Sequence, residues 1–336
     1  MKTSGLIKIL ALCVGLASCG PESNNSVPLS GDVDGFAGGT LTANYSKSNP
    51  AQSVVLISRR DDVSASFCGG LLIGRNKVLT ARHCAITESN ARYLTVLFPK
   101  GDKSVSTSTS FFASTKSAEV RRVAFPDGKK LLPNVNVNFD AKDWNTRVFI
   151  FDAAVLELAT NAPDFVPVFD VKNMATDEDL RGGRLSSFGW DSDVIEFNGS
   201  NNYSDIVRRE NKSLRVSDKS LLDRFFASQD LKTYCHGRND KCSLEQSAMP
   251  MLYGRTAQSI KLLTTSPHPI CQGDSGSPLF VITKEGKYKL LGVTSSGLAI
   301  NGREVDRSLT GIVVCSAHTF YQTVLPLKGW LQQVGN

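Results

Sequence analysis

The stretch that most constrains the fold of this chain is Cys271-Gln272-Gly273-Asp274-Ser275-Gly276-Ser277-Pro278. Gly273 can adopt backbone angles closed to other residues, so the N–H groups of Gly273 and Ser275 can point into one small space. Two such donors would stabilise the oxyanion that develops during acyl transfer. The serine hydroxyl still needs a base, and that base needs an orienting acid. The sequence therefore predicts a nucleophilic serine that depends on a histidine and an acid elsewhere in the chain.

Two upstream segments supply that histidine and that acid. They are Val78-Leu79-Thr80-Ala81-Arg82-His83-Cys84 and Phe151-Asp152-Ala153-Ala154-Val155-Leu156-Glu157-Leu158. These segments, and the chain order His83, Asp152, Ser275, resemble the chymotrypsin/trypsin family of serine endopeptidases. Two supporting segments, 67–73 and 291–297, are also similar to the family. Arg82 stands where the family has an alanine, and Ser277 stands where it has a glycine.

The resemblance implies a role for each residue of the site. His83 would take the proton of Ser275 during attack and later give it to the leaving amine. Asp152 would fix the tautomer of the imidazole and stabilise the imidazolium. The N–H groups of Gly273 and Ser275 would form the oxyanion hole. The strand that pairs with the substrate backbone corresponds to Ser295, Ser296 and Gly297, with Ser296 in place of a usual tryptophan.

The predicted specificity pocket differs from that of family members that cleave after Arg or Lys. Those members carry an Asp six residues before the nucleophile, where this chain has Pro269, followed by Ile270. Thr319 stands where a glycine of the pocket wall is common. Ile270 and Thr319 would narrow the pocket and favour small or medium apolar side chains. His268 and His318 leave open a preference for acidic side chains.

The resemblance also implies activation by cleavage. Phe36-Ala37-Gly38-Gly39-Thr40 is similar to the start of the mature family domain, although Phe36 replaces the usual Ile or Val. Cleavage before Phe36 would free an α-amine that pairs with Asp274 and orders the oxyanion loop. The alternative is that Phe36 lies in an ordinary surface loop.

The N-terminus is predicted to direct export. Residues 1–18 contain two lysines and a short apolar run, 9–16, which is typical of a secretion signal and too short to span a bilayer. Leu16-Ala17-Ser18-Cys19 resembles the bacterial lipobox, which implies cleavage before Cys19 and its lipidation; the alternative is an ordinary signal peptide. Residues 19–35 are polar and are expected to form a flexible spacer or propeptide. We expect a lipid-anchored protein of the cell envelope, at the outer membrane, or a secreted one.

The eight cysteines fit an exported protein. Two of them lie in the signal and at the lipidation site. The resemblance implies the disulfides Cys68–Cys84 and Cys271–Cys315, and it leaves Cys235 to pair with Cys242. A metal site at Cys235, His236 and Cys242 is the rival interpretation, but no fourth ligand lies nearby, so we expect no metal and no other cofactor.

Short β-branched and aromatic runs between turn signals predict antiparallel strands. The predicted strands are 53–58, 68–73, 77–80, 93–98, 118–125, 153–158, 184–190, 208–216, 261–263, 278–283, 289–294 and 311–315. A short helix is predicted at 221–230, and 325–333 resembles the C-terminal helix of the family. Together with the resemblance, they predict an all-β fold of two six-stranded antiparallel barrels with the active site between them and a C-terminal helix. The protease domain would span 36–336, with barrel one at about 36–165 and barrel two at about 166–336.

The charge of the chain argues against nucleic-acid binding. The formal net charge is +6, or +4 (6 − 2) once the two lysines of the signal are removed, and this is too weak for such a partner. We expect a monomeric, exported serine endopeptidase that acts on proteins or peptides and contacts a membrane through its lipid anchor. A catalytically silent binding protein on the same fold is the alternative. An esterase or lipase would want G-x-S-x-G, and Ser277 replaces the last glycine of that pattern.

Overall fold

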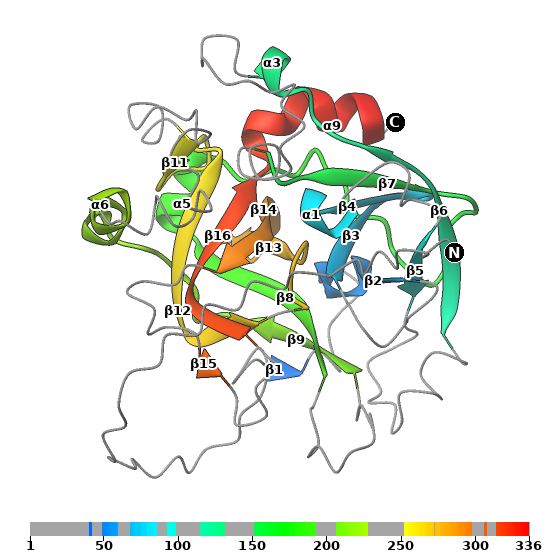
Figure 1. Ribbon diagram of the computed structural model, residues 1–336, viewed down its shortest axis with the longest axis horizontal. Coiled ribbons are helices and arrows are strands. Elements are labelled where there is room, and N and C mark those ends of the chain that lie inside the picture. Colours follow the sequence, from blue (N-terminus) through cyan, green and yellow to red (C-terminus); the bar gives the residue numbers. More distant parts are fainter. Residues whose placement is uncertain are drawn as a thin grey trace, which may run out of the picture. The chain divides into compact units, whose positions relative to one another are not determined.

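The computed structural model describes residues 40–41, 49–59, 68–85, 93–98, 115–131, 151–192, 206–227, 252–271, 273–297, 306–307 and 314–335. All of them belong to the compact unit Val33–Asn336. They form mostly β-strands with a few short helices (Figure 1), which confirms the predicted all-β class. Among these residues, no helix combines the length and the apolar character needed to cross a membrane.

The first six long strands close into a barrel. They are β2 (Val54–Arg59), β3 (Cys68–Gly74), β4 (Lys77–Thr80), β5 (Leu94–Phe98), β6 (Lys116–Ala124) and β7 (Ala154–Leu158). Their order around the barrel is β2-β3-β4-β7-β6-β5, and every neighbouring pair is antiparallel. Alternate side chains of a strand point to the same face. One hydrophobic cluster therefore takes members from all six strands, among them Val55, Leu72, Val78, Val96, Val120 and Leu156.

The remaining strands form a second, larger sheet. Its members are β1 (Thr40–Leu41), β8 (Arg184–Ser192), β9 (Ile206–Asn211), β10 (Arg215–Val216), β11 (Tyr253–Gly254), β12 (Lys261–Cys271), β13 (Pro278–Ile282), β14 (Tyr288–Gly297), β15 (Asp306–Arg307) and β16 (Val314–Thr323). The main order is β1-β9-β8-β13-β14-β16-β12-β10, with β11 beside β12 and β15 beside β16. β1 pairs with β9, so residues 40–41 add to this sheet although they precede the first barrel in the chain.

The predicted second barrel takes the form of a curled sheet that side chains join at its seam. Six strands run in the order β9-β8-β13-β14-β16-β12, and no backbone ladder links β9 to β12 within the described residues. Asn211 Nδ2 instead donates to Ser266 Oγ at 3.2 Å, and the hydroxyls of Ser213 and Ser266 lie 3.0 Å apart. Polar side chains thus connect the two strands that a complete barrel would pair.

Several strands of this sheet differ in extent from the prediction. The predicted strand 208–216 is divided into β9 and β10. β12 runs on to Cys271 instead of ending at residue 263, and its pairing with β16 shifts register between Thr265 and Ile270. Pro267 and Pro269 lie inside this interval. Proline has no backbone N–H to donate, and this is tolerated here because the pairing is already irregular. β16 was predicted at 311–315, but it continues to Thr323.

The helices are short. They are η1 (Pro50–Ser53), α1 (Arg82–Ala85), α3 (Gly128–Leu131), α5 (Asp177–Gly182), α6 (Lys219–Ala227), η3 (Leu325–Leu327) and α9 (Lys328–Gly335). The predicted C-terminal helix is confirmed as η3 followed by α9, and α6 corresponds to the predicted helix 221–230. α5 lies between the predicted strands 153–158 and 184–190, where no helix is predicted. A capping box between Thr176 and Asp179 begins this helix.

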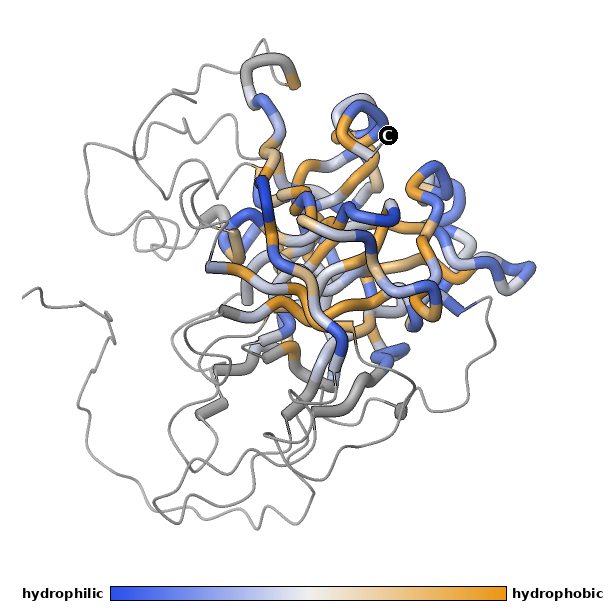
Figure 2. Tube along the Cα trace, turned by 90° about the vertical axis from the view of Figure 1, so that its right-hand side faces the viewer, coloured by the Kyte–Doolittle hydropathy of each residue, from blue (hydrophilic) through white to orange (hydrophobic). Residues whose placement is uncertain are grey.

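A large hydrophobic cluster joins the two sheets and the C-terminal helix. It contains Leu71 of β3, Phe188 of β8, Phe280 of β13 and Leu331 of α9, all completely buried or nearly so. Trp190 Nε1 also donates to the carbonyl of Val55 at 3.0 Å, from the second sheet to the first barrel. Figure 2 shows hydrophobic segments along the strands, whereas the outer turns are mostly hydrophilic. Buried apolar surface therefore holds the two halves against each other.

Candidate active site

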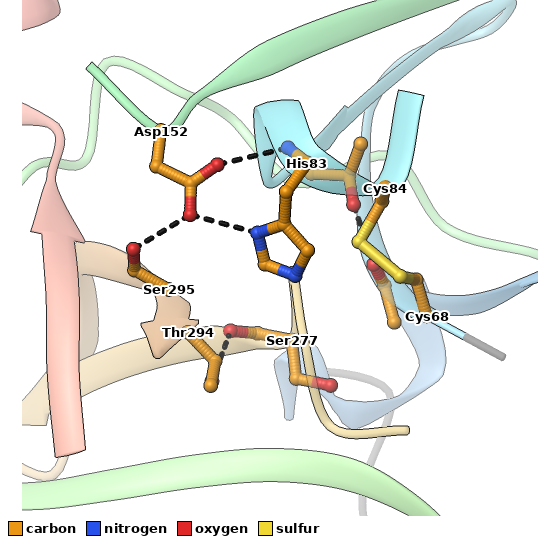
Figure 3. Close-up of a disulfide and its surroundings, with 9 residues drawn as sticks. Cys68, His83, Cys84, Asp152, Ser277, Thr294 and Ser295 are labelled. Carbon is orange, nitrogen blue, oxygen red and sulfur yellow. Dashed lines mark hydrogen bonds and ion pairs between the residues drawn. A yellow bond between two sulfur atoms is a disulfide. The ribbon is translucent and has the colours of Figure 1, made fainter. Parts of the chain in front are cut away.

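The pairing of β4 with β7 brings His83 and Asp152 together. Thr80 lies opposite Ala154 in this pair, so the residues just beyond the two strand ends are neighbours. His83 Nδ1 lies 2.8 Å from Asp152 Oδ2, and the backbone N–H of His83 donates to Asp152 Oδ1 at 2.9 Å (Figure 3). Both carboxylate oxygens thus bind one residue. This arrangement favours the tautomer that carries its proton on Nδ1.

Other residues hold Asp152 in an entirely buried position. Its backbone N–H donates to Gln322 Oε1 at 2.9 Å, and Ser295 Oγ donates to Asp152 Oδ2 at 2.6 Å. Burial alone would raise the pKa of Asp152. The charges of His83 and Lys261 and the hydrogen bonds from His83 and Ser295 outweigh burial and lower this pKa to about 2. Asp152 is therefore a carboxylate at neutral pH.

The loop that carries Ser275 packs directly on the first barrel. The N–H of Gly69 in β3 donates to the carbonyl of Ser275 at 2.7 Å. Gly276 has φ +78°, and a Cβ there would lie 2.1 Å from Thr80 Oγ1, so both backbone angle and space require glycine. Gly276 also donates its N–H to the carbonyl of Thr294 at 2.8 Å, one residue from Ser295. The backbone of Ser275 is therefore fixed between β3 and β14, while its predicted proton transfer to His83 stays a prediction.

The predicted oxyanion hole includes a second glycine with an unusual backbone angle. Gly273 has φ +108°, and a Cβ added there would meet no atom of the described residues within 4 Å. The role of the Gly273 and Ser275 N–H groups stays a prediction. Asp274, between them, is 2% exposed.

The disulfide predicted beside the histidine is confirmed. Cys68 at the start of β3 is bonded to Cys84 in α1, the residue after His83. Both sulfurs lie close to His83 (Figure 3), and because they are bonded to each other they offer no thiolate to a metal ion. The disulfide thus attaches the helical turn of His83 to the barrel wall.

Two of the departures from the family pattern, Arg82 and Ser277, have structural explanations. The guanidinium of Arg82 lies over the ring of Phe125, 4.4 Å from its centroid, in a cation–π contact. Ser277 is completely buried, and its side chain packs against Gly69. The absence of a side chain at Gly69 makes room for it, because a Cβ there would lie 2.0 Å from the Ser277 Oγ. Both replacements are therefore accommodated by neighbours beside the site.

A buried lysine extends the network around Asp152. Lys261 Nζ donates to Ser295 Oγ at 2.6 Å, and the residue is 3% exposed. Burial lowers the pKa of Lys261 to about 8, although the charge of Asp152 partly opposes this shift. Sequence reasoning missed Lys261 and Gln322, and it gave Ser295 only a place in the substrate strand. A lysine at the first position of a predicted strand carries no local sign of burial.

The predicted substrate-binding residues lie on three adjacent strands. Gly297 of β14 faces Thr319 of β16, Ser296 faces Phe320, and Ile270 of β12 faces Ser316. Pro269 precedes Ile270 within the register shift of β12. Thr319 and Ile270 are buried, at 1% and 5% exposure. The preference for small or medium apolar side chains stays a prediction.

Several predictions fall on residues that the structure does not describe, or describes only in the backbone. Three predictions concern residues outside the described ones. They are the lipidation of Cys19, the activation ion pair of Phe36 and the disulfide between Cys235 and Cys242. Cys271 and Cys315 are opposite each other in the pairing of β12 with β16. The Cα atoms of antiparallel residues that face each other are close enough for a disulfide, so the backbone is compatible with this bond. The disulfide Cys271–Cys315 itself stays a prediction.

The chain is similar to known solved structures. Among solved structures, the chain is similar to the secreted serine protease VesC from Vibrio cholerae, with 17% identity, a TM-score of 0.48, and coverage of 86% of this chain and 47% of that chain. It is also similar to human heparin binding protein, with 18% identity, a TM-score of 0.46, and coverage of 88% and 95%. The chain thus spans about half the length of the VesC chain.

The family model described as Trypsin matches residues 38–219, a range that includes His83 and Asp152 and ends before Ser275. This match covers more than half of the 336 residues. The chain therefore belongs to the trypsin family of serine proteases.

Proposed function

We propose that this chain is an exported serine endopeptidase that hydrolyses peptide bonds through an acyl-enzyme, with His83, Asp152 and Ser275 as its catalytic triad. The observation that supports this most strongly is the double attachment of Asp152 to His83, at 2.8 Å and 2.9 Å. A buried carboxylate that binds both the ring N–H and the backbone N–H of one histidine fixes its tautomer and its orientation. That is the requirement of a general base that must leave Nε2 free to accept a proton.

In the proposed reaction, His83 Nε2 takes the proton of the Ser275 hydroxyl while the oxygen attacks the substrate carbonyl. The N–H groups of Gly273 and Ser275 stabilise the oxyanion. His83 then gives the proton to the leaving amine, and an acyl-enzyme on Ser275 remains. Water, deprotonated by His83, attacks this ester and restores the serine. Asp152 stays ionised throughout, in agreement with its low pKa.

The proposal includes the maturation of the chain. Export through residues 1–18, lipidation at Cys19 and activation by cleavage before Phe36 follow the motifs of the sequence. Disulfide Cys68–Cys84 supports an oxidising compartment, because such bonds persist mainly in exported proteins.

The test is the intact mass of the exported protein before and after exposure to a fluorophosphonate probe. We expect one addition in the form that starts at Phe36, and none in Ser275→Ala, which should also lose peptide hydrolysis while it stays folded. Ser277→Ala is the matched control from the same loop. Its buried Oγ has no hydrogen-bond partner in the described part of the chain, so its removal should affect neither folding nor labelling.

Labelling of the form that still starts at Cys19 would retain the protease and reject activation by cleavage. An unlabelled Phe36 form would favour the alternative of a binding protein on a protease fold. Hydrolysis of peptides by Ser275→Ala would reject the assignment of the nucleophile.

A further inference from the structure

A chain of hydrogen bonds connects a buried lysine to His83. Lys261 Nζ donates to Ser295 Oγ at 2.6 Å, and Ser295 Oγ donates to Asp152 Oδ2 at 2.6 Å. The same Asp152 oxygen lies 2.8 Å from His83 Nδ1, and Figure 3 shows Ser295, Asp152 and His83 in this order. We infer that Lys261 is a positioning residue: its ammonium fixes the Ser295 O–H toward Asp152 and so holds the Asp152–His83 pair for catalysis. This inference rests on the proposed function.

The direction of each bond follows from the chemistry of the groups. An ammonium has three donors and no acceptor, so Ser295 Oγ must accept from Lys261. A hydroxyl has a single proton, and once its oxygen accepts from Lys261 that proton is available for Asp152. A neutral amine could accept instead, and the Ser295 proton could then turn away from Asp152. The charge of Lys261 therefore decides whether Asp152 receives this hydrogen bond.

The backbone around Lys261 is tied to Asp152 by a second route. Lys261 lies opposite Gln322 in the pairing of β12 with β16. The Gln322 amide accepts from the N–H of Asp152 at 2.9 Å and donates to the carbonyl of Ile260 at 3.0 Å. One side chain thus connects the backbone of Asp152 to the residue before Lys261. Gln322 thus holds the backbone at Asp152 and the backbone next to Lys261 in place.

Stability alone does not explain this lysine. Moving an ammonium out of water is costly, and a buried ion pair often stabilises a fold no better than apolar residues of similar size. Lys261 is 3% exposed, yet its ammonium forms no direct salt bridge with any of the described residues and reaches Asp152 through a hydroxyl. A methionine of similar length could fill this space without that cost. The lysine is better explained by what it does to Ser295 and Asp152.

The titration of Lys261 supplies a pH signature. Among the described residues, the titratable groups on its side of the sheet are Asp152, with His83 beyond it, and Tyr253, opposite it on β11. Tyr321 is next to Gln322 on β16, so its side chain points to the other face. Burial raises the pKa of Tyr321, which leaves that phenol neutral, and Asp152 is the charge that acts on Lys261. Because the pKa of Lys261 is about 8, its ammonium is present at neutral pH and is lost as the pH rises through that value. Activity should decline over the same range.

The test compares Lys261→Met and Lys261→Arg with the unmodified protease. We expect Lys261→Met to lose roughly 10- to 100-fold in kcat at neutral pH with little change in KM, because the loss acts through Asp152 and His83. A guanidinium stays charged at all accessible pH values, so Lys261→Arg should remain active and lack the decline near pH 8. Lys289→Met is the matched control, since it removes a lysine that pairs with Asp179 away from the site. Its kinetics should be unchanged.

A spectroscopic readout separates this inference from the proposed function. The proton shared by His83 Nδ1 and Asp152 is expected as a low-field NMR resonance in the Ser275→Ala protein, where no turnover occurs. Its shift should follow a titration with a midpoint near pH 8, and Lys261→Met should abolish this titration.

If the unmodified chain hydrolyses nothing but the resonance follows Lys261, the proposed function fails and the positioning role stands. If the chain is a protease and Lys261→Met keeps its kcat, its pH profile and its resonance, the positioning role is overturned. Should Lys261→Met fail to fold, a resonance in the Ser275→Ala protein that does not respond between about pH 6 and 10 would overturn it as well.

Discussion

The first barrel and the second sheet contribute to the site in different ways. The first barrel is closed by backbone pairing on every side, and it carries His83, Asp152 and the disulfide Cys68–Cys84. The second sheet is joined at its seam by side chains, and it carries the Ser275 loop together with the residues that surround Asp152. His83 and Asp152 thus come from one half, while part of their environment comes from the other. Neither half alone could set the ionisation of Asp152.

Three hydrogen bonds connect the first barrel to the second sheet. Gly69 of the first barrel donates to the Ser275 carbonyl at 2.7 Å, and Trp190 of the second sheet donates to Val55 at 3.0 Å. The N–H of Asp152 donates to Gln322 at 2.9 Å. All three cross from one half to the other. The comparison therefore predicts that variants in the first barrel and in the second sheet affect activity and stability differently.

The largest expected effect comes from Asp152→Asn, which changes the acid of the first barrel without changing its size. An amide can present its NH₂ group to His83 and stabilise the wrong tautomer, so kcat should fall by about 10⁴-fold. Steady-state kinetics on a peptide substrate would measure this loss. Thermal unfolding is the control, because the side chain keeps its volume. A loss below tenfold would mean that Asp152 does not orient His83 during turnover.

A second prediction concerns the disulfide that attaches the His83 turn to the barrel wall. Replacement of both Cys68 and Cys84 by alanine should lower the free energy of unfolding by about 3 kcal/mol, since the bond closes a loop with a sequence separation of 16. Denaturant titration would measure the change. Activity should also fall, because Cys84 follows His83 directly. Unchanged stability would indicate that the closed barrel holds this turn without its covalent bond.

The same comparison separates what the sequence predicts well from what it does not. In the first barrel, runs such as 77–80 alternate with clear turns, and β4 has the predicted bounds. In the second sheet, the apolar pattern is interrupted by Pro267, by Pro269 and by the segment Ser316-Ala317-His318. The strands β12 and β16 nevertheless continue through them. Their buried polar groups are satisfied by neighbouring strands, and a local pattern cannot show such partners.

The residues of the candidate site also differ in how well the sequence predicts them. His83, Asp152 and Ser275 lie in recognisable motifs, so their candidacy follows from the sequence. Lys261 and Gln322 lie in no motif, and their positions near Asp152 depend on the pairing of β12 with β16. Contacts between residues far apart in the chain are set by tertiary packing, which the sequence of either strand does not encode by itself.

The smallest effect that we predict tests the seam of the second sheet. Asn211 is 1% exposed, donates to Ser266 Oγ at 3.2 Å, and accepts from the N–H and hydroxyl of Ser213 at 3.0 Å and 2.7 Å. Asn211→Ala removes all three bonds and should cost about 1–2 kcal/mol of stability, because the buried Ser266 and the partly buried Ser213 each lose a hydrogen-bond partner. Hydrogen exchange should accelerate in β9 and β12 and stay unchanged in β2 to β7, whose ring is closed by backbone bonds. Ser213→Ala is the matched control, since it removes only the hydroxyl contacts and should have a smaller effect at the same place. Equal acceleration in both halves would mean that the barrel and the sheet open as one cooperative unit, and the hydrophobic cluster between them would then be the stronger constraint on the site.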